Sequence, residues 1–486
     1  MPASRYTARS MSQTVTPPPG PPQTDSERHK WYVMAVIALG TIGAVILSTS
    51  FNVAVPALMQ HFHVGNDEVQ LAVTTFMVTS TIAMLPTPWL IQRFGLRASF
   101  LGAVALLTVS SLAGSFSPSF NLLLLARSVQ GICAGILYPL GTFAVMSLFP
   151  PSRQGRASGL LGFSIVLAPA VSPALGGVII DHYGWEAVFY ISIPFCLIAL
   201  FGGWRHMPVH DAARHQDFDW SGMLLLSTMT LAFLGTITHF QGSGEGDLLL
   251  YGELLLAIGT LAGFLYHAKH SPRALVGIEI FRRPTLVMGL AISSIYGFGI
   301  YGSTYLIPLY LQTIMGLSAT HAGAILVPGG IGLALSLPLA GWLADRTSPR
   351  FVVLGGLIML ALSFAGMALV AARGAYDFFI ELTLLGRVGS GLIIASLNQA
   401  AMQGLHGPLL AQSAMFIGYV RQLGGVLGVA AVAVYIAWRS IELGGSSMES
   451  HAHVFAEAFL ISTVIFSLAA FTAWRMRPNR DNDTAV

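Results

Sequence analysis

The chain has 486 residues, of which 54% are hydrophobic and only 9% are charged, and its formal net charge is +3. A soluble protein carries about 25% charged residues, so this composition excludes a water-soluble enzyme or binding domain of this length. The small net charge argues against a nucleic-acid partner. The apolar residues fall in blocks of about 20, the length of helix that crosses the hydrocarbon core of a bilayer. We therefore predict an all-α polytopic membrane protein.

The first residues of the chain, 1–31, are polar and rich in proline, which predicts a disordered cytosolic tail. The first apolar block is too long for a signal-peptide core and lacks a convincing cleavage site, so it is expected to be a membrane helix. The fourteen predicted transmembrane helices cover residues 32–57, 69–91, 98–117, 121–145, 156–180, 185–204, 220–240, 248–268, 285–312, 320–343, 351–372, 376–399, 413–437 and 453–475.

The distribution of basic residues tests this set of helices, because lysine and arginine concentrate in cytosolic loops. With the N-terminus in the cytoplasm, 19 of the 24 lysines and arginines fall on the cytosolic side and 3 lie within helices. Only Arg373 and Arg439 fall outside. An even number of helices with both termini in the cytoplasm is expected.

An internal repeat divides the chain into two halves. The second and tenth predicted helices are each followed by a Trp-Leu pair and two arginines, which are Trp89, Leu90, Arg93 and Arg97 in one copy and Trp342, Leu343, Arg346 and Arg350 in the other. Each copy is followed by a glycine-rich helix with an arginine, Arg127 or Arg387. Duplicated halves are typical of secondary transporters that alternate access around a central site.

Three further patterns occur in the expected helices. The fourth contains RSVQG at 127–131, the fifth contains APAVSPALGG at 168–177, and the tenth ends in GWLADR at 341–346. On these residues the chain, from about 32 to 475, resembles the major facilitator superfamily, specifically its 14-helix drug:proton antiporter branch. The resemblance implies a six-helix bundle at 32–204, a linker region with two extra helices at 205–284, a second six-helix bundle at 285–475 and a cytosolic tail at 476–486.

The resemblance also implies roles for particular residues. The proton-coupling and antiporter motifs comprise Arg127, Gln130, Gly131, Pro169, Pro173, Gly176 and Gly177. The gating loops comprise Arg93, Gly95, Arg97, Gly341, Asp345 and Arg346, with Gln92 where an aspartate is usual, so a weaker charge latch is expected in the first half. The alternatives are a kinked packing helix at 168–177, an Arg127 that snorkels to the interface, and arginines that only set topology.

The first helix carries LSTSFNVAVP at 47–56, which resembles a signature of the same branch with Leu47 in place of its aspartate. That acid is tied to proton coupling or cation recognition in the family, so its absence puts both functions in doubt. The candidate cavity residues are Thr49, Asn52, Phe76, Tyr138, Tyr301, Tyr305 and Arg421. Hydrogen bonding between helices is the alternative for Thr49 and Asn52, and packing against neighbouring helices or lipid is the alternative for the four aromatic residues.

Three glutamates are candidate proton carriers: Glu253, Glu381 and Glu457. A carboxylate in a low dielectric binds protons more readily than one in water. All three lie near predicted outer helix ends, so ordinary ionised residues at the interface are the favoured alternative.

These features predict a secondary active transporter in the inner membrane that exports small organic compounds, drugs or toxic amphipaths, in exchange for protons. No enzyme activity, cofactor or metal is expected, since no phosphate loop, zinc motif or catalytic cluster is present. The alternative is a dedicated exporter or importer of one metabolite. The resemblance leaves open a periplasmic adaptor and an outer-membrane channel as partners if the source is Gram-negative.

Overall fold

The protein is helical wherever the structure describes it. The computed structural model describes residues 27–208, 217–243, 248–271, 274–317, 319–373, 378–442 and 448–476. Most of the two predicted tails, 1–26 and 477–486, lies outside these residues. Sixteen helices and no strands occur in the described part. Long apolar segments become helices because a helix satisfies all of its backbone hydrogen bonds within the segment.

The helices fall into three groups along the chain. The first half comprises α1 (Glu27–Phe62), α2 (Asn66–Ala83), α3 (Thr87–Ser115), α4 (Phe120–Leu148), α5 (Pro151–Tyr183), α6 (Ala187–Tyr190) and α7 (Ser192–His206). The linker region comprises α8 (Trp220–Ser243), α9 (Leu248–His270) and α10 (Glu279–Arg282). The second half comprises α11 (Pro284–Thr313), α12 (Ala319–Arg346), α13 (Pro349–Ala371), α14 (Phe379–Met402), α15 (Gly407–Glu442) and α16 (Met448–Arg475).

Many of these helices are long and apolar enough to span a bilayer. Eleven spans of the described residues meet both conditions, one of them formed by α6 and α7 together, and α2 and α8 contain shorter apolar stretches. Twelve of the fourteen predicted ranges overlap one helix each, while 69–91 is divided between α2 and α3 and 185–204 between α6 and α7. The protein is therefore a multi-pass membrane protein, and the number fourteen stays a prediction.

The boundaries differ from the prediction at the second helix. The predicted range 69–91 is divided, because α2 ends at Ala83 and α3 begins at Thr87 after Pro86. Proline lacks a backbone N–H and interrupts the helical ladder. The junction predicted between the second and third helices is a sharp kink inside α3 at Gly95, whose φ of 81° favours glycine.

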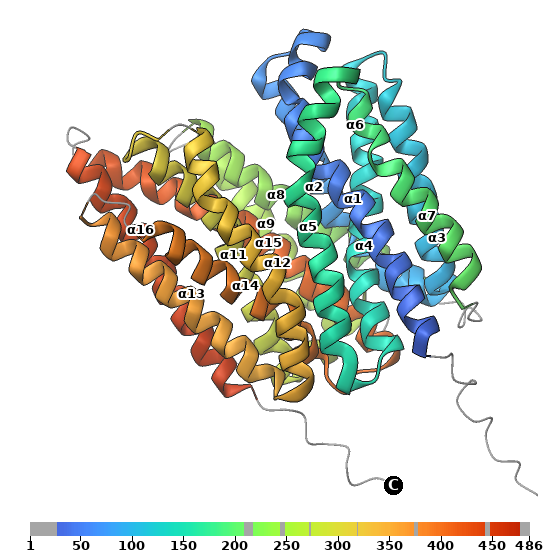
Figure 1. Ribbon diagram of the computed structural model, residues 1–486. Helices are drawn as coiled ribbons and strands as arrows, with labels where there is room; N and C mark the ends of the chain where they lie inside the picture. Colours follow the sequence, from blue (N-terminus) through green and yellow to red (C-terminus); the bar gives the residue numbers. More distant parts are fainter. Residues whose placement is uncertain are drawn as a thin grey trace, which may run out of the picture.

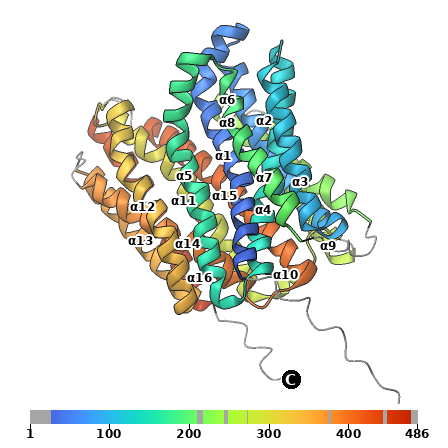
Figure 2. The same cartoon turned by 45° about the vertical axis from the view of Figure 1, so that its right-hand side comes forward.

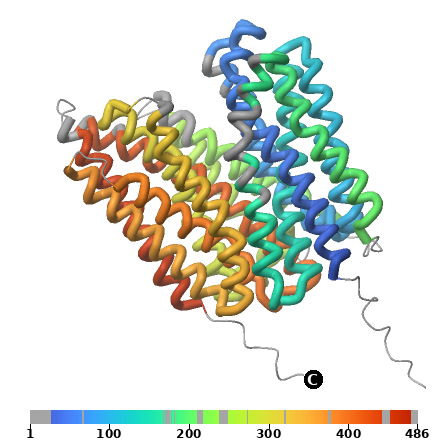
Figure 3. Tube along the Cα trace, in the orientation of Figure 1, coloured from blue at the N-terminus to red at the C-terminus, as the bar shows by residue number. Residues whose placement is uncertain are grey.

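The two halves repeat the same packing. In the first half α1 packs on α5, α2 on α4 and α3 on α7; in the second half α11 packs on α15, α12 on α14 and α13 on α16. The tube in Figure 3 separates the blue-to-green first half from the yellow-to-red second half. The repeat seen in the sequence is therefore a repeat of structure.

The helices α8 and α9 form a hairpin outside these six-helix groups. The α8 helix contacts α2 of one half and α15 of the other. The hydroxyls of Thr230 on α8 and Tyr419 on α15 are hydrogen bonded at 2.6 Å. Only 17% of the 18-residue apolar stretch of α9 is buried. The described part of this pair is therefore peripheral.

The two halves approach each other at one end of the molecule. Figures 1 and 2 show the bundles converging where α1 begins and α16 ends, and diverging toward the opposite end. Apolar side chains of both halves, including Met84 and Leu161 of the first and Ile417 of the second, belong to one buried cluster. Contact between the halves is thus concentrated near the chain termini.

Close helix contacts in the second half depend on glycine. A Cβ atom added at Gly424 of α15 would lie 2.1 Å from the carbonyl oxygen of Ser294 on α11. One added at Gly297 of α11 would lie 2.0 Å from the carbonyl oxygen of Arg421. These backbones touch directly, which is the contact that small residues permit between membrane helices.

We predict that Gly424→Leu destabilises the protein, because the new side chain collides with the rigid backbone of α11. Overpacking of this kind costs about 1–3 kcal/mol or more. The apparent Tm of the purified protein in detergent should fall by several degrees. Gly355→Leu on α13 is the matched control, since a Cβ atom there meets nothing within 4 Å. Equal Tm values for the two variants would contradict the close contact.

Candidate functional site

A carboxylate of one half is hydrogen bonded to the N-terminal part of a helix in the other half. Asp345, near the end of α12, accepts hydrogen bonds from the backbone N–H groups of Gly155 at 2.7 Å and Arg156 at 3.0 Å. The Arg156 Nε lies 3.7 Å from the same carboxylate, whose side chain is only 2% exposed. These N–H groups lie near the positive end of the α5 dipole, which favours a negative charge. Asp345 therefore clamps α5 to α12.

The clamp is possible because α5 and α12 cross without side chains between them. A Cβ atom added at Gly341 would lie 2.1 Å from the carbonyl oxygen of Gly155, and one at Gly155 would lie 2.3 Å from that of Gly341. The Gln399 side chain of α14 also donates to the carbonyl of Pro151 at 2.8 Å. Glycines and polar groups together close this end of the molecule.

The symmetry-related contact is looser. The pair that corresponds to α5 and α12 is α15 and α2, which touch more sparsely. Gln92, at the position equivalent to Asp345, makes no hydrogen bond with the described residues. The Sδ atom of Met84 lies 3.8 Å from the position that a Cβ at Gly418 would take, an ordinary apolar contact. The two halves are thus latched by charge on one side only.

Arg127 occupies the interior of the first bundle. Its side chain, on α4, is 1% exposed. The Nε atom donates to the carbonyl of Ala72 at 3.2 Å, and a terminal nitrogen donates to Gln130 Oε1 at 3.0 Å. The guanidinium carbon lies 4.0 Å from the ring centre of Phe51 and 4.4 Å from that of Phe76. Two hydrogen bonds and two cation–π contacts hold the charge without a carboxylate.

Neighbouring groups extend this network. Gln130 donates to the carbonyl of Ser110 on α3 at 3.2 Å, so Arg127 is connected to three other helices. Gly131, one turn from Arg127, allows α4 to touch α2, since a Cβ there would lie 2.5 Å from the carbonyl of Phe76. The Leu47 side chain is fully buried one turn before Phe51. An apolar contact therefore occupies the position where the sequence comparison leads one to expect an acid.

A second group of polar side chains lies between the halves. Tyr138 on α4 of the first half has Tyr301 on α11 of the second half in its neighbourhood. Arg421 on α15 lies in the neighbourhood of Tyr301, and both Arg421 and Arg387 on α14 lie in the neighbourhood of Tyr296. Tyr301 is 38% exposed although its ring lies against Gly425 of the neighbouring helix. Side chains from both halves therefore face a common polar region.

Comparisons with known proteins identify the family of this chain. Residues 37–429 match the sequence profile of the Major Facilitator Superfamily. The chain belongs to this superfamily.

Its relatives include a multidrug resistance protein B homolog of Mycobacterium tuberculosis, 29% identical over 409 residues, which are 83% of this chain and 76% of the relative. A tetracenomycin C resistance and export protein of Streptomyces glaucescens is 29% identical over 417 residues, 84% of this chain and 76% of the relative. A solved proton:xylose symporter superposes with a TM-score of 0.64 at 15% identity, covering 92% of this chain and 96% of its own. The symporter shares the fold, and the two resistance proteins agree with the drug:proton antiporter branch.

The predicted proton carriers of this major facilitator protein lie away from the polar region between the halves. Glu457 of α16 is bound by Arg439 of α15, with N–O distances of 2.9 and 3.0 Å, and by the hydroxyl of Tyr435 at 2.7 Å. Glu253 lies against Gly235 in the peripheral α8–α9 pair. Glu381 is exposed in the first turn of α14. A proton-carrying role for these residues stays a prediction.

The remaining predicted residues occupy varied positions. Thr49 donates to the carbonyl of Val45 on its own helix at 2.8 Å, and Asn52 is exposed. Tyr305 is 37% exposed on α11. For Pro169, Pro173 and Gly177 only the helical backbone of α5 is described. Gly176 faces α1, where an added Cβ would lie 3.3 Å from that of Ser50.

The basic residues of the gating motifs do not join the Asp345 clamp. Arg97 donates to the carbonyl of Trp204 on α7 at 2.6 Å. The guanidinium of Arg346 stacks over Trp342 at 4.1 Å from the ring centre. Arg93 forms no hydrogen bond or ion pair with the described residues. In the second motif the acid therefore makes the contact between halves, while the arginine beside it packs on its own helix.

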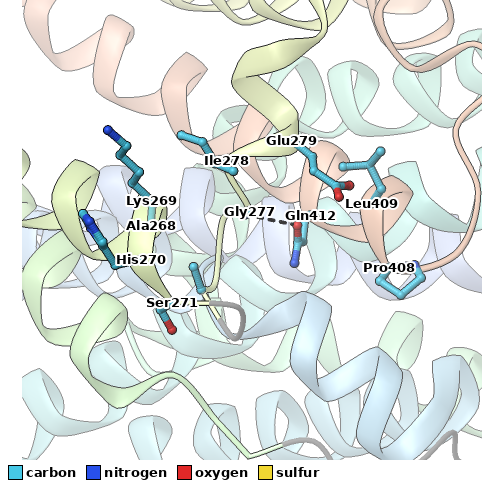
Figure 4. Close-up of a pocket in the computed structure, with 11 residues that line it drawn as sticks. Ala268, Lys269, His270, Ser271, Gly277, Ile278, Glu279, Pro408, Leu409 and Gln412 are labelled. Carbon is cyan, nitrogen blue, oxygen red and sulfur yellow. Dashed lines mark hydrogen bonds between the residues drawn. The ribbon is translucent and has the colours of Figure 1, made fainter.

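A separate pocket of about 420 Å³ lies where the linker meets the second half. Lys269 and His270 of α9, Glu279 of α10 and Gln412 of α15 line it, and the backbone N–H of Gly277 donates to Gln412 Oε1 at 3.3 Å across it (Figure 4). The pocket therefore lies between the linker and α15, and Arg127, Arg387 and Arg421 are not among its lining residues.

Three important residues were absent from the predicted site: Tyr296, Arg387 and Gln399. Arg387 was visible as the repeat of Arg127, which is the signal that identifies it. Tyr296 and Gln399 carry no such signal, since their roles arise from helices distant in sequence.

We predict that Asp345→Asn weakens the contact between α5 and α12, because charged hydrogen bonds to backbone N–H groups become neutral ones. The loss should be about 1–2 kcal/mol. Spin labels at the exposed positions Ser152 and Thr347 should report a larger fraction of long distances by electron double resonance. Glu27→Gln is the control, because its ion pair with Arg153 is exposed on the surface. An unchanged distance distribution would show that the glycine crossing alone holds this end closed.

We predict that Arg127→Lys lowers the free energy of unfolding, because an ammonium group lacks the planar fork that Ala72, Gln130 and the two rings surround. The expected loss is about 1.5–3 kcal/mol. Thermal unfolding in detergent measures it. Ser128→Ala on the same helix should change little, since that hydroxyl bonds only to its own helix at Leu124. A Lys variant as stable as wild type would contradict the network.

Proposed function

We propose that the chain exports small organic compounds, among them drugs and toxic amphipaths, across the cytoplasmic membrane by alternating access and in exchange for protons. The observation that carries the proposal is the one-sided closure of two repeated halves by Asp345 over a polar region between them. The names of relatives, which include multidrug resistance and antibiotic export proteins, support the direction and the kind of cargo.

The proposed topology places both termini in the cytoplasm of an inner-membrane protein, with bundles at 32–204 and 285–475 and the linker region at 205–284. The distribution of lysine and arginine supports this orientation. The Asp345 clamp then lies at the cytosolic end, and the structure corresponds to the outward-facing state. Release of the clamp would let the halves rock about the central region and open it to the cytoplasm.

Arg127 is proposed as the residue that couples the proton gradient to this motion. Its hydrogen bonds and ring contacts connect α1, α2, α3 and α4, so a change in its partners would be transmitted across the whole first half. The antiporter motif at 168–177 supports export, because it lies on α5, the helix that the clamp holds. A periplasmic adaptor and an outer-membrane channel belong to the proposal only for a Gram-negative source.

The test measures accumulation of a panel of dyes and antibiotics in bacteria that lack their own efflux pumps. Cells that express the protein should accumulate less of some compounds, and a protonophore should abolish the difference. Arg127→Ala should reduce efflux at least about tenfold, the effect of removing one residue of a coupling network. Ser128→Ala is the matched control and should export normally. Membrane abundance of each variant is measured by immunoblot.

Two results would contradict the proposal. Efflux that survives the protonophore would exclude energy coupling to the proton gradient. No change in accumulation across a chemically broad panel would favour a dedicated exporter or importer of one metabolite, with Leu47 at the usually acidic position as the reason for lost breadth.

A further inference from the structure

Two arginines of the second half, Arg387 and Arg421, differ from Arg127 in their hydrogen bonding. Arg127 is surrounded by partners, whereas Arg387 and Arg421 make no hydrogen bond and no ion pair within the part of the chain that the structure describes. Both side chains are half-buried within membrane-spanning helices. A guanidinium carries five N–H donors and is costly to bury unless they are satisfied. These two arginines therefore keep unengaged donors within membrane-spanning helices.

Arg387 lines a small pocket enclosed by α11, α13 and α14. Three serines in its wall already donate their protons to backbone carbonyls: Ser303 to Ile300 at 2.9 Å, Ser363 to Leu382 at 2.6 Å and Ser390 to Gly386 at 2.9 Å. Thr383, also in the wall, is 2% exposed and its hydroxyl has no partner. The unused polar groups of the pocket are therefore the N–H donors of Arg387 and the O–H of Thr383.

Arg421 adds a second positive charge to the same region. Tyr296 of α11 is near enough to both arginines to feel their charges, and Tyr301 is near enough to Arg421. No salt bridge joins either arginine to a carboxylate among the described residues. The field of this region is therefore positive, which attracts an anion and repels a cation.

We propose that this half binds the acidic head group of an organic anion, a carboxylate or sulfonate, through Arg387, Thr383 and Arg421. The proposal rests on the proposed export function and names its substrate class. A planar guanidinium matches a carboxylate in two-point hydrogen bonding, and the threonine hydroxyl supplies a further donor. The apolar body of the substrate lies beside Tyr138 and Tyr301, which face the region between the halves.

This assignment gives a physical reason for the missing acid at Leu47. A cationic substrate would need a carboxylate in the cavity, and none of the three candidate glutamates lies there. An anionic substrate needs the opposite charge, which the second half provides. The inside-negative membrane potential also drives an anion outward, in the direction of export.

The test measures binding of three matched probes to the full chain in lipid nanodiscs: 2-naphthoate, its neutral analogue 2-naphthalenemethanol, and the cation 2-naphthylmethylammonium. Equilibrium dialysis against empty nanodiscs corrects for partition into lipid. The wild-type chain should bind the anion at least about tenfold more tightly than the cation, the effect expected of one charged hydrogen bond. Arg387→Gln and Arg421→Gln should each weaken naphthoate binding about tenfold and change binding of the alcohol less than about twofold.

Two further variants separate recognition from folding. Thr383→Val should weaken naphthoate binding severalfold without lowering thermal stability, because it removes a buried hydroxyl that has no partner. Arg475→Gln is the charge-matched control, since that arginine is exposed in the last turn of α16 against Phe471. It should bind all three probes as the wild type does.

Equal affinity of the wild type for the anion and the cation overturns the assignment, and this result needs no variant to fold. Unchanged naphthoate binding in Arg387→Gln and Thr383→Val also overturns it. Selective anion binding without protonophore-sensitive efflux would instead contradict the export function and leave the site standing. Efflux of cations by a chain that does not bind naphthoate would contradict the anion site and leave the export function standing.

Discussion

The constraint on which the rest of this structure depends is the burial of positive charge in a low-dielectric interior. Arg127 meets it inside the first bundle through Ala72, Gln130 and two aromatic rings, and so holds four helices in one arrangement. Its counterpart in the repeat, Arg387, keeps the charge but has none of these partners. The two halves share one architecture but use the arginine differently. The donors of Arg127 bind groups of the protein, whereas those of Arg387 are proposed to bind a ligand.

A second constraint shapes the contact between the halves. Lipid provides no hydrophobic driving force between helices, so they must associate through close packing and hydrogen bonds. Direct backbone contact replaces this driving force, at Gly155 and Gly341 between the halves and at Gly297 and Gly424 within the second half. The Asp345 clamp adds a charged hydrogen bond that can be broken. Its absence at Gln92 makes the closure asymmetric, which suits a protein that must release one end before it opens the other.

Much of the fold could be predicted because hydrocarbon admits few solutions. Runs of apolar residues had to be helices, and the basic residues between them predict which loops share a side. The prediction was wrong at the second helix, where Pro86 breaks the range 69–91 and Gly95 carries the kink. Composition detects an apolar segment long enough to span the bilayer. It does not detect a break in the helix, because a single proline or glycine can change the backbone geometry there.

The sequence by itself determined the class of protein, the repeat, and the positions of the buried arginines and of Asp345, because each depends on residue type and order along the chain. Only the tertiary structure decided what those charges meet. Glu457 is neutralised by Arg439, Asp345 grips a helix that begins nearly 200 residues earlier at Pro151, and Arg387 faces an unpartnered Thr383. Hydrogen-bond partners on different helices are brought together by packing, and no local pattern in the chain records which side chains will face one another.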